Sequence, residues 1–286
     1  MKIRTIKQKL KAMEVTEGAG VSVHRTIGTP ALKNLDPFLL LDHFSSSDPD
    51  DYIAGFPDHP HRGFVTLTYM LDGHMLHQDS MGNRGDLRAG GAQWMKAASG
   101  VIHSEMPQQS EGLMRGFQLW INLPAAEKMS DPEYQEYSPA AIPLVKTDQV
   151  QVRVVCGDYN GQTSVINDPI TRVKYLDVSL EPGSEFIYDI DTSFNSFIYV
   201  FEGDARCGDE PVLKHTLLVL GDGDRVVIHA NGEACRFVLI AGLPVNEPVV
   251  QYGPFVMNTR EEIERAFNDY RDGKLVSHKA VFHTDH

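Results

Sequence analysis

Two short strand-like segments with potential metal ligands lie 44 residues apart in this chain, His59-Pro60-His61 and His103-Ser104-Glu105. Each segment places two ligand-type side chains at positions i and i+2, which project from the same face of a β-strand. Two such strands side by side would direct three imidazoles and one carboxylate at a single point. Imidazole favours iron, copper, nickel and zinc, and a carboxylate adds a hard ligand. The pattern therefore predicts a site for one divalent transition metal.

The residues after His61 predict where this site opens. Gly63, Val65, Leu67 and Tyr69 have the same parity as His61, so the ligand face is expected to continue into an apolar interior, as at the mouth of a barrel. Competing ligands occur nearby in the sequence. None of them is tied to a second pair on another strand, so we interpret them as turn and surface polarity. They are His77 and Asp79, another same-face pair, together with His43, His74 and Asp58.

The composition predicts a globular protein that does not bind nucleic acid or membranes directly. Apolar residues make up 42% of the 286 residues, and 26 Lys and Arg stand against 39 Asp and Glu, a formal net charge of −13. Gripping phosphate or anionic lipid needs clustered positive charge instead. The three cysteines have no CxxC spacing and fit a reducing compartment. No segment reads as a signal peptide or a membrane span, so we expect a cytoplasmic protein.

Short apolar runs rich in Val, Ile, Phe and Tyr, bounded by Gly, Asp, Ser or Pro, predict an all-β fold in two series of strands. A Pro- and Ala-rich segment separates the two series, and we place the domain boundary there, giving domains 1–140 and 141–286. One helix is predicted near 260–272, where Thr259 and Glu262 form a capping box. Ile263, Ala266, Phe267 and Tyr270 then share one face, and Gly273 can end the helix.

Five segments of the chain resemble the pirin family of the cupin superfamily. They are FPDHPHRGFVTLTYMLDG (56–73), GAQWMKAASGVIHSEMP (91–107), FLLLDHF (38–44), GFQLWINLP (116–124) and YGPFVMNTREEIERAFNDYRDGKL (252–275). The resemblance extends from about residue 15 to 275. It implies two jelly-roll (cupin) β-barrel domains, with one metal in the N-terminal domain. The family's ligands fall on His59, His61, His103 and Glu105, the same four that strand parity selects.

The resemblance implies iron(II) as the first candidate metal, and nickel, copper, cobalt, manganese or zinc are alternatives. Some pirins resemble quercetin 2,3-dioxygenases, which open a flavonol ring and release carbon monoxide. In that interpretation the substrate is a flavonol, and Glu105 is a metal ligand that also accepts the proton of the substrate hydroxyl. The alternative is an iron-dependent, redox-sensitive regulatory protein that binds a transcription factor or a metabolic enzyme without turnover.

Val65 departs from the family pattern, which has Glu in HPHRGFE where this chain has HPHRGFV. Glu105 is then the only well-placed carboxylate, and Val65 is expected to face the pocket and make it drier. The C-terminal domain is predicted to hold no metal, because His215 and His229 form no HxH or HxE pair. Asp222 and Asp224 are interpreted as turn residues.

Overall fold

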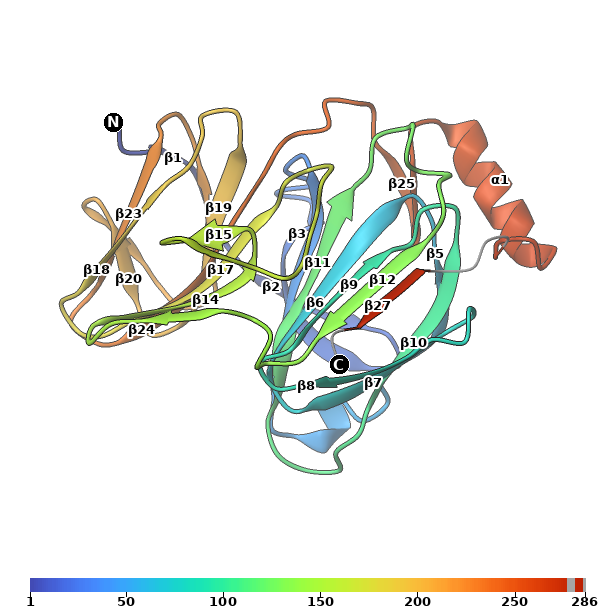
Figure 1. The fold of residues 1–286 in the computed structure, drawn as a ribbon, viewed down its shortest axis with the longest axis horizontal. Coiled ribbons are helices and arrows are strands. Elements are labelled where there is room, and N and C mark those ends of the chain that lie inside the picture. The colour runs from blue at the N-terminus through green and yellow to red at the C-terminus, as the bar shows by residue number, and fades with distance from the viewer. Residues whose placement is uncertain (277–280, 285–286) are drawn as a thin grey trace. The chain divides into compact units, whose positions relative to one another are not determined.

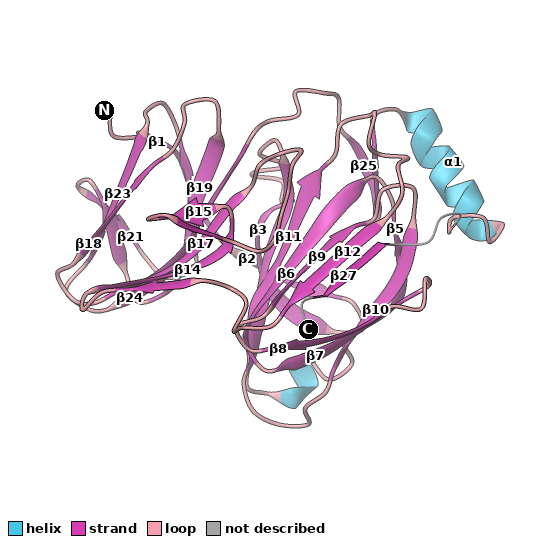
Figure 2. Cartoon of the chain, in the orientation of Figure 1, coloured by secondary structure: helices cyan, strands magenta, loops and turns pink. Residues whose placement is uncertain are grey.

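The computed structural model describes residues 1–276 and 281–284, and these residues are mostly in β-strands (Figures 1 and 2). The described part contains one α-helix, α1 (Arg260–Arg271), and one short 3-10 turn, η1 (Pro49–Asp51). The chain forms two compact units. The site unit comprises residues 14–28, 37–141 and the described residues from 245 onward, and the second unit comprises residues 1–13, 29–36 and 142–244. The prediction of an all-β protein with two jelly-roll domains and a helix near the end is confirmed.

The site unit is built from an eight-stranded and a four-stranded sheet. The larger sheet has the order β2-β3-β4-β11-β6-β9-β12-β27, and the smaller has the order β5-β10-β7-β8. The strands are β2 (Met13–Glu17), β3 (Val21–Ile27), β4 (Phe38–Ser46), β5 (Phe56–His61), β6 (Phe64–Asp72), β7 (His74–Asp79), β8 (Arg84–Arg88), β9 (Ala92–Lys96), β10 (Val101–Pro107), β11 (Met114–Asn122), β12 (Glu133–Tyr137) and β27 (Val281–Thr284), with the separate pair β25 (Val250–Tyr252) and β26 (Phe255–Met257).

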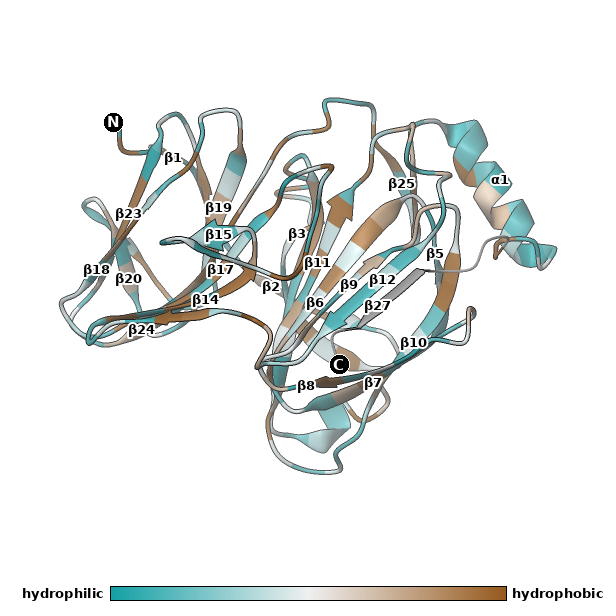
Figure 3. Cartoon of the chain, viewed as in Figure 1, coloured by the Kyte–Doolittle hydropathy of each residue, from teal (hydrophilic) through white to brown (hydrophobic). Residues whose placement is uncertain are grey.

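The two sheets of the site unit pack through their apolar faces. A buried cluster draws Phe44 and Met70 from the larger sheet and Met75 and Leu87 from the smaller. Hydrophobic and hydrophilic residues alternate along several strands, as a sheet with one buried face requires (Figure 3). Among the described residues the two sheets do not join into a closed barrel, and the unit is a two-sheet jelly roll consistent with the predicted cupin fold.

The second unit has the same two-layer plan, with an apolar cluster packed between its two sheets. Its seven-stranded sheet has the order β1-β22-β19-β24-β17-β14-β13 and its four-stranded sheet the order β18-β23-β20-β21. Its core cluster takes side chains from both sheets, among them Leu176, Ile198, Phe186 and Ile228. The strands are β1 (Ile6–Lys11), β13 (Leu144–Lys146), β14 (Val150–Cys156), β15 (Asp158–Tyr159), β16 (Gln162–Thr163), β17 (Lys174–Leu180), β18 (Glu185–Asp189), β19 (Asn195–Glu202), β20 (Ala205–Cys207), β21 (Glu210–Val212), β22 (Thr216–Leu220), β23 (Arg225–Ala230) and β24 (Cys235–Gly242).

Helix α1 begins at the predicted capping box. The Thr259 side chain accepts a hydrogen bond from the Glu262 amide, and the Glu262 carboxylate accepts from the Thr259 amide. Ile263 and Ala266 are buried in a cluster with residues of β26. Phe267 and Tyr270, predicted on the same stripe, are 36% and 41% exposed, so the packed face is narrower than expected.

The compact units differ from the two contiguous halves, 1–140 and 141–286, that the sequence indicates. The chain leaves the site unit between residues 141 and 142, near the expected boundary, but it returns after residue 244. Helix α1 therefore belongs to the unit that carries His59, His61 and His103. Strand β1 belongs to the second unit, because it pairs with β22 there.

Gly63 connects β5 to β6 and so carries the chain from the smaller to the larger sheet of the site unit. Its φ is +91°, in the left-handed region that favours glycine. A Cβ at this position would lie 1.9 Å from the carbonyl oxygen of Val256. Both the backbone conformation and the close approach therefore require glycine.

Gly63→Ala is expected to lower the free energy of unfolding by about 3 kcal/mol or more, because the clash adds to the backbone strain. Gly82→Ala is the matched control, since Gly82 has a φ of +83° and no atom within 4 Å of its Cβ position. That control should lose only about 1 kcal/mol. Urea unfolding of both variants measures the difference, and equal losses would contradict the role given to the Val256 carbonyl.

Candidate metal centre

Strands β5 and β10 bring three histidines together in the site unit. The two strands are antiparallel neighbours, with His59 opposite His103 and His61 opposite Val101. One ring nitrogen from each histidine lies within 4.8 Å of one ring nitrogen of each of the others. The ring centroids of His59 and His103 are 4.3 Å apart, and those of His61 and His103 are 4.9 Å apart. This is the convergence that strand parity predicts for neighbouring β-strands.

Each of these three rings has one nitrogen engaged by a partner other than a metal. His59 Nδ1 lies 2.8 Å from the Pro57 carbonyl oxygen, and His61 bonds to the Pro254 carbonyl. The remaining nitrogens of the two buried rings, His61 Nδ1 and His103 Nε2, have no hydrogen-bond partner. Buried polar atoms are nearly always paired, so these two nitrogens fit a ligand that the protein itself does not provide.

The protonation of the buried rings also suits metal binding. Burial, followed by repulsion from His59, lowers the pKa of His61 well below its usual value. The same two causes, with further repulsion from His61 and His77, lower the pKa of His103. Both rings are therefore neutral at pH 7, and neutral imidazole is the form that binds metal.

Glu105 lies beside His103 but in a different grouping from the one predicted. A bulge in the pairing of β10 with β5 falls between His103 and Glu105. A bulge re-aims the side chains that follow it. The Glu105 carboxylate groups within 4.8 Å with His77 and His103, and it is not in the group that contains His59 and His61. Its Oε1 lies 3.2 Å from the Thr68 hydroxyl.

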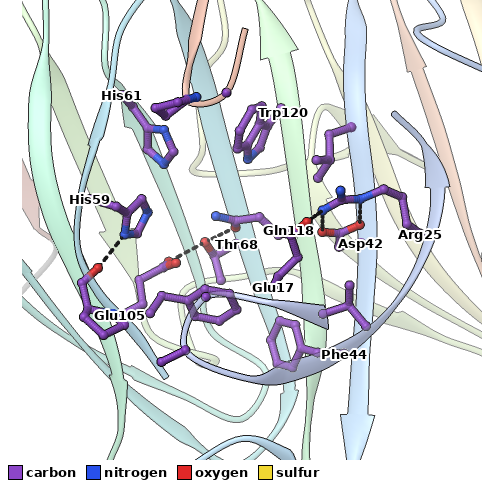
Figure 4. Close-up of a pocket in the computed structure, with 18 of the residues that line it drawn as sticks. Glu17, Arg25, Asp42, Phe44, His59, His61, Thr68, Glu105, Gln118 and Trp120 are labelled. Carbon is purple, nitrogen blue, oxygen red and sulfur yellow. Dashed lines mark hydrogen bonds and ion pairs between the residues drawn. The ribbon is translucent and has the colours of Figure 1, made fainter. Parts of the chain in front are cut away.

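A cavity of about 680 Å³ extends into the site unit from His59 and His61, which line one end of it (Figure 4). This volume lies in the range of small-molecule sites. Figure 4 shows His59 and His61 on one side of the cavity, and Arg25 and Asp42 on the other. Arg25 makes a bidentate ion pair with Asp42, at 2.7 and 2.6 Å. The apolar lining comes from Val23, Leu40, Phe44, Phe56, Met75 and Trp120.

The side chain of Val65 does not face this cavity. In the pairing of β6 with β11, Thr68 lies opposite Gln118 and Val65 lies opposite Ile121. Thr68 and Gln118 both line the cavity, and residues directly opposite each other project from the same face. Val65 and Ile121 therefore lie on the other face of the sheet. The prediction that Val65 faces the pocket is wrong.

The reason is that the chain passes from the smaller to the larger sheet at Gly63. His61 ends β5 in the smaller sheet, whereas β6 starts at Phe64 in the larger one. Strand parity holds only within one strand, so counting from His61 to Val65 across a left-handed glycine selects the wrong face. The ring of Phe64 lies 5.0 Å from that of His61, which places the even-numbered residues of β6 toward the histidines.

Val65→Glu is expected to destabilise the fold without creating a ligand. Val65 is 1% exposed, and Lys96, its neighbour on β9, already binds Glu127 and Glu133. A third carboxylate there is poorly compensated, and we expect a loss of about 2–4 kcal/mol. Added iron(II) should raise the melting temperature equally in wild type and variant. A larger rise in melting temperature in the variant would indicate that the side chain at position 65 faces the pocket after all.

His77 and Asp79 are part of the buried structure around the site, contrary to the interpretation of surface polarity. Both side chains are 1% exposed, and His77 Nδ1 lies 3.3 Å from His103 Nδ1. His43 is also buried, whereas His74 pairs with Asp86 at the surface. The sequence signal was present, because His77-Gln78-Asp79 has the same i, i+2 spacing as the ligand pairs.

The histidines of the second unit lie at separate places. His229 Nδ1 is 3.8 Å from Glu185, with both side chains partly exposed, and His215 Nδ1 lies 3.1 Å from the Tyr199 hydroxyl. The Asp224 carboxylate accepts a hydrogen bond from the Lys2 amide, a role in chain geometry that fits the turn interpretation. Asp222 lies in the same turn, and its carbonyl accepts from the Thr5 amide.

In the described part of the chain, no helix has the length and apolar character needed to cross a membrane.

Comparison with known proteins assigns the chain to a family. The family model for pirin matches residues 20–121, and the model for the pirin C-terminal cupin domain matches residues 175–276. A Pseudomonas aeruginosa protein named "Putative quercetin 2,3-dioxygenase" is 46% identical, over 91% of this chain and 94% of its own. A pirin-like protein of Solanum lycopersicum is 47% identical, over 95% of this chain and 92% of its own.

A solved structure has the same fold over nearly the whole chain. The crystal structure of quercetin 2,3-dioxygenase from Acinetobacter baumannii superposes with a TM-score of 0.89 and 30% identity. The match covers 96% of this chain and 99% of that one. Two family models that together span most of the sequence, and relatives above 40% identity over nearly their full length, lead to one conclusion: the chain belongs to the pirin family of two-domain cupin proteins.

Proposed function

We propose that this chain is a metal-dependent dioxygenase that opens flavonols of the quercetin type. The observation that carries the proposal is the set of three converging imidazoles, with unpartnered nitrogens on His61 and His103. Two of these residues, His59 and His61, line a cavity of about 680 Å³. The names of the Pseudomonas and Acinetobacter relatives support this substrate class. His59, His61, His103 and Glu105 would hold one divalent transition metal, with iron(II) as the first candidate.

When bound, the metal would supply a Lewis acid that binds the adjacent hydroxyl and keto oxygens of a flavonol and activates the flavonol toward dioxygen. The reaction consumes dioxygen, places both of its oxygen atoms in the ring-opened product and releases carbon monoxide. The protein must therefore position a flat aromatic molecule, remove the proton of its 3-hydroxyl and keep water away.

Glu105 and Thr68 provide a place for that proton. Thr68 Oγ1 lies 3.2 Å from Glu105 Oε1 and 2.5 Å from Gln118 Oε1. The hydroxyl has one hydrogen, so it donates to one of these oxygens at a time. When Glu105 gains the substrate proton, Thr68 can turn its hydrogen toward Gln118 and accept from the new carboxylic acid. Glu105 thus changes from acceptor to donor without losing its partner.

The cavity walls suit a flat aromatic molecule. Trp120 packs against Phe64 and His61, with ring centroids 4.3 and 5.2 Å apart, so its plane is fixed next to the histidines. Phe44 and Leu40 extend this apolar wall away from them. A fixed aromatic side chain binds a flat ring at low entropic cost and excludes water from the bond-breaking region. Arg25 and Asp42 offer polar partners for phenolic hydroxyls at the far side.

The test is an anaerobic titration of protein purified without a metal-chelating tag and analysed for metal. Quercetin should shift its absorption on binding, and admission of oxygen should bleach it with release of one carbon monoxide per flavonol. The matching flavone without the 3-hydroxyl is the ligand control, since it lacks the hydroxyl that must lose its proton and chelate together with the 4-keto oxygen. His74→Ala is the protein control, because His74 lies on β7 and pairs with Asp86 at the surface.

The outcomes separate the two functions considered. Oxygen-dependent loss of the flavonol, absent with the flavone, would establish the dioxygenase. A metal-loaded protein that leaves quercetin intact in oxygen would contradict it and favour the regulatory alternative, in which the metal's oxidation state biases a binding surface.

A further inference from the structure

A buried polar chain runs from His103 away from the cavity. His103 Nδ1 lies 3.3 Å from His77 Nδ1. His77 Nε2 faces Asp79 Oδ2 at 3.7 Å, which is too long for a hydrogen bond, so these two groups interact electrostatically. The three residues face one another across the pairing of β10 with β7, in which His103 lies opposite Asp79 and Glu105 opposite His77. None of the three side chains is more than about 1% exposed, so solvent does not compete for these contacts.

Asp79 is fixed as an acceptor at the end of this chain. Its Oδ1 accepts hydrogen bonds from the amides of Met81 and Asn83, at 2.9 and 3.0 Å. Its Oδ2 accepts from Asn83 Nδ2 at 2.8 Å and faces His77. A carboxylate held this way attracts an N–H of the facing imidazole and repels its lone pair. The hydrogen of neutral His77 is therefore favoured on Nε2, which leaves a lone pair on Nδ1.

The ring of His77 is also held in its plane. It packs against Tyr134 in a tilted arrangement, with ring centroids 4.9 Å apart and an interplanar angle of 37°. The Tyr134 hydroxyl donates to Glu136 Oε2 at 2.6 Å. Packing against this anchored ring opposes the ring flip that would exchange the two nitrogens of His77.

From this geometry we propose that His77 is a positioning residue that fixes the tautomer of His103. Between two Nδ1 atoms 3.3 Å apart there is room for one hydrogen. Because His77 Nδ1 carries the lone pair, His103 Nδ1 must carry that hydrogen. The lone pair of His103 is then on Nε2, the nitrogen that has no partner in the protein. Asp79, through His77, thereby prepares His103 to bind the metal.

The inference rests on the metal site of the proposed function and is tested on metal binding alone. The probe is copper(II), because its pulsed electron paramagnetic resonance counts bound imidazoles and reports the hydrogen bond at each remote nitrogen. The dissociation constant comes from competition with a chromophoric chelator. The variants are His77→Phe, which keeps the stacking ring without an acceptor, and His77→Gln, whose amide oxygen can accept from His103. His74→Phe on the same strand is the control.

His77→Phe should weaken copper binding about 10- to 100-fold, the usual cost of losing such an outer partner. The imidazole count should stay at three, and the remote-nitrogen signal of one ring should change. His77→Gln should restore affinity to within about threefold of wild type. Unchanged affinity and signal in His77→Phe would overturn the proposal. So would a loss of one imidazole from the count, because His77 would then be a ligand itself, grouped with His103 and Glu105.

Asp79→Asn keeps the test decisive if His77→Phe does not fold. An asparagine can keep its oxygen on the Met81 and Asn83 amides and would then present its NH₂ group to His77. That donor moves the hydrogen of His77 to Nδ1, where it meets the Nδ1 hydrogen of His103. We expect about a tenfold loss of copper affinity, and no loss would overturn the proposal. Failure of the wild type to bind any metal would overturn both proposals, whereas the expected His77 effects without flavonol turnover would overturn the proposed function alone.

Discussion

Alanine at His103 is expected to lower the affinity for metal by more than about 100-fold. Two groups of potential ligand atoms in the described residues share His103, one with His59 and His61 and the other with His77 and Glu105. Loss of a ligand should exceed the 10- to 100-fold that loss of an outer partner costs. Metal content after dialysis against buffers of fixed free metal measures the effect, with circular dichroism as the check on folding.

Removal of the metal with a chelator provides a second test of the role of His103, through the melting temperature. A chelator should lower the melting temperature of wild type, because a ligand that binds only the folded state stabilises it. The same chelator should leave the melting temperature of His103→Ala unchanged. His229→Ala in the second unit is the control and should behave as wild type in both experiments. Full metal content in His103→Ala would show that the site lies elsewhere.

Methionine at Lys128 is expected to destabilise the site unit by about 3–5 kcal/mol. Lys128 is 1% exposed, and its Nζ donates to the Gly63 carbonyl, Asn122 Oδ1 and the Val256 carbonyl at 2.7, 2.7 and 3.0 Å. Methionine fills a similar volume but leaves three buried acceptors without a donor, each costing about 1–3 kcal/mol before relaxation. The same bonds link the turn after His61 to β26.

Lys96→Met is the matched control for this substitution. Lys96 is also poorly exposed, but its partners, Glu127 and Glu133, are 38% and 36% exposed and can turn to water. We expect a loss of about 1 kcal/mol in that variant. Urea unfolding at pH 7 measures both. Comparable losses of unfolding free energy in the two variants would mean that the contribution of Lys128 to stability does not depend on the burial of its acceptors.

The pH dependence of the Lys128→Met effect follows from the protonation of the amine. Burial lowers the pKa of Lys128 to about 8, whereas in the unfolded chain the usual lysine value is about 10.4. Between about pH 8 and pH 10 the unfolded state therefore binds more protons than the folded state. Stability rises with pH in that situation. The free energy of unfolding of wild type, relative to Lys128→Met, should increase over that window by up to about 1.4 kcal/mol per pH unit.

Features set by a single strand or by one helical turn were accessible from the sequence. The i, i+2 spacing placed His59 and His61 on one face, and the pairing of β5 with β10 brings His103 beside them. The capping box at Thr259 fixed the start of α1. The spacing of His59 and His61 and the capping box each lie within one strand or one turn, so local geometry determines them. The pairing of β5 with β10 is a long-range contact, and the sequence indicated it only through the second ligand pair at His103 and Glu105.

Features that depend on how distant strands are arranged in space could not be predicted from the sequence. Parity failed for Val65 because Gly63 moves the chain into another sheet, and no local pattern shows such a change. His77 was assigned to the surface because no second pair on another strand was tied to it in the sequence, whereas in the structure it lies opposite Glu105 on β10. The contiguous domain boundary likewise could not show that residues 245 onward return to the site unit.

The alternation of the chain between the units, with crossings after residues 13, 28, 36, 141 and 244, limits how this protein can recombine. A crossover near residue 140 between two distant relatives would join one parent's histidine strands to the other parent's C-terminal segment. That segment supplies the Pro254 carbonyl to His61, the Val256 carbonyl to Lys128 and the Asp269 carboxylate to Arg62, at 2.7 Å for the last pair. Viable chimaeras therefore have to inherit residues 37–141 and 245–275 from the same parent, although a hundred residues of the other unit separate them in the gene.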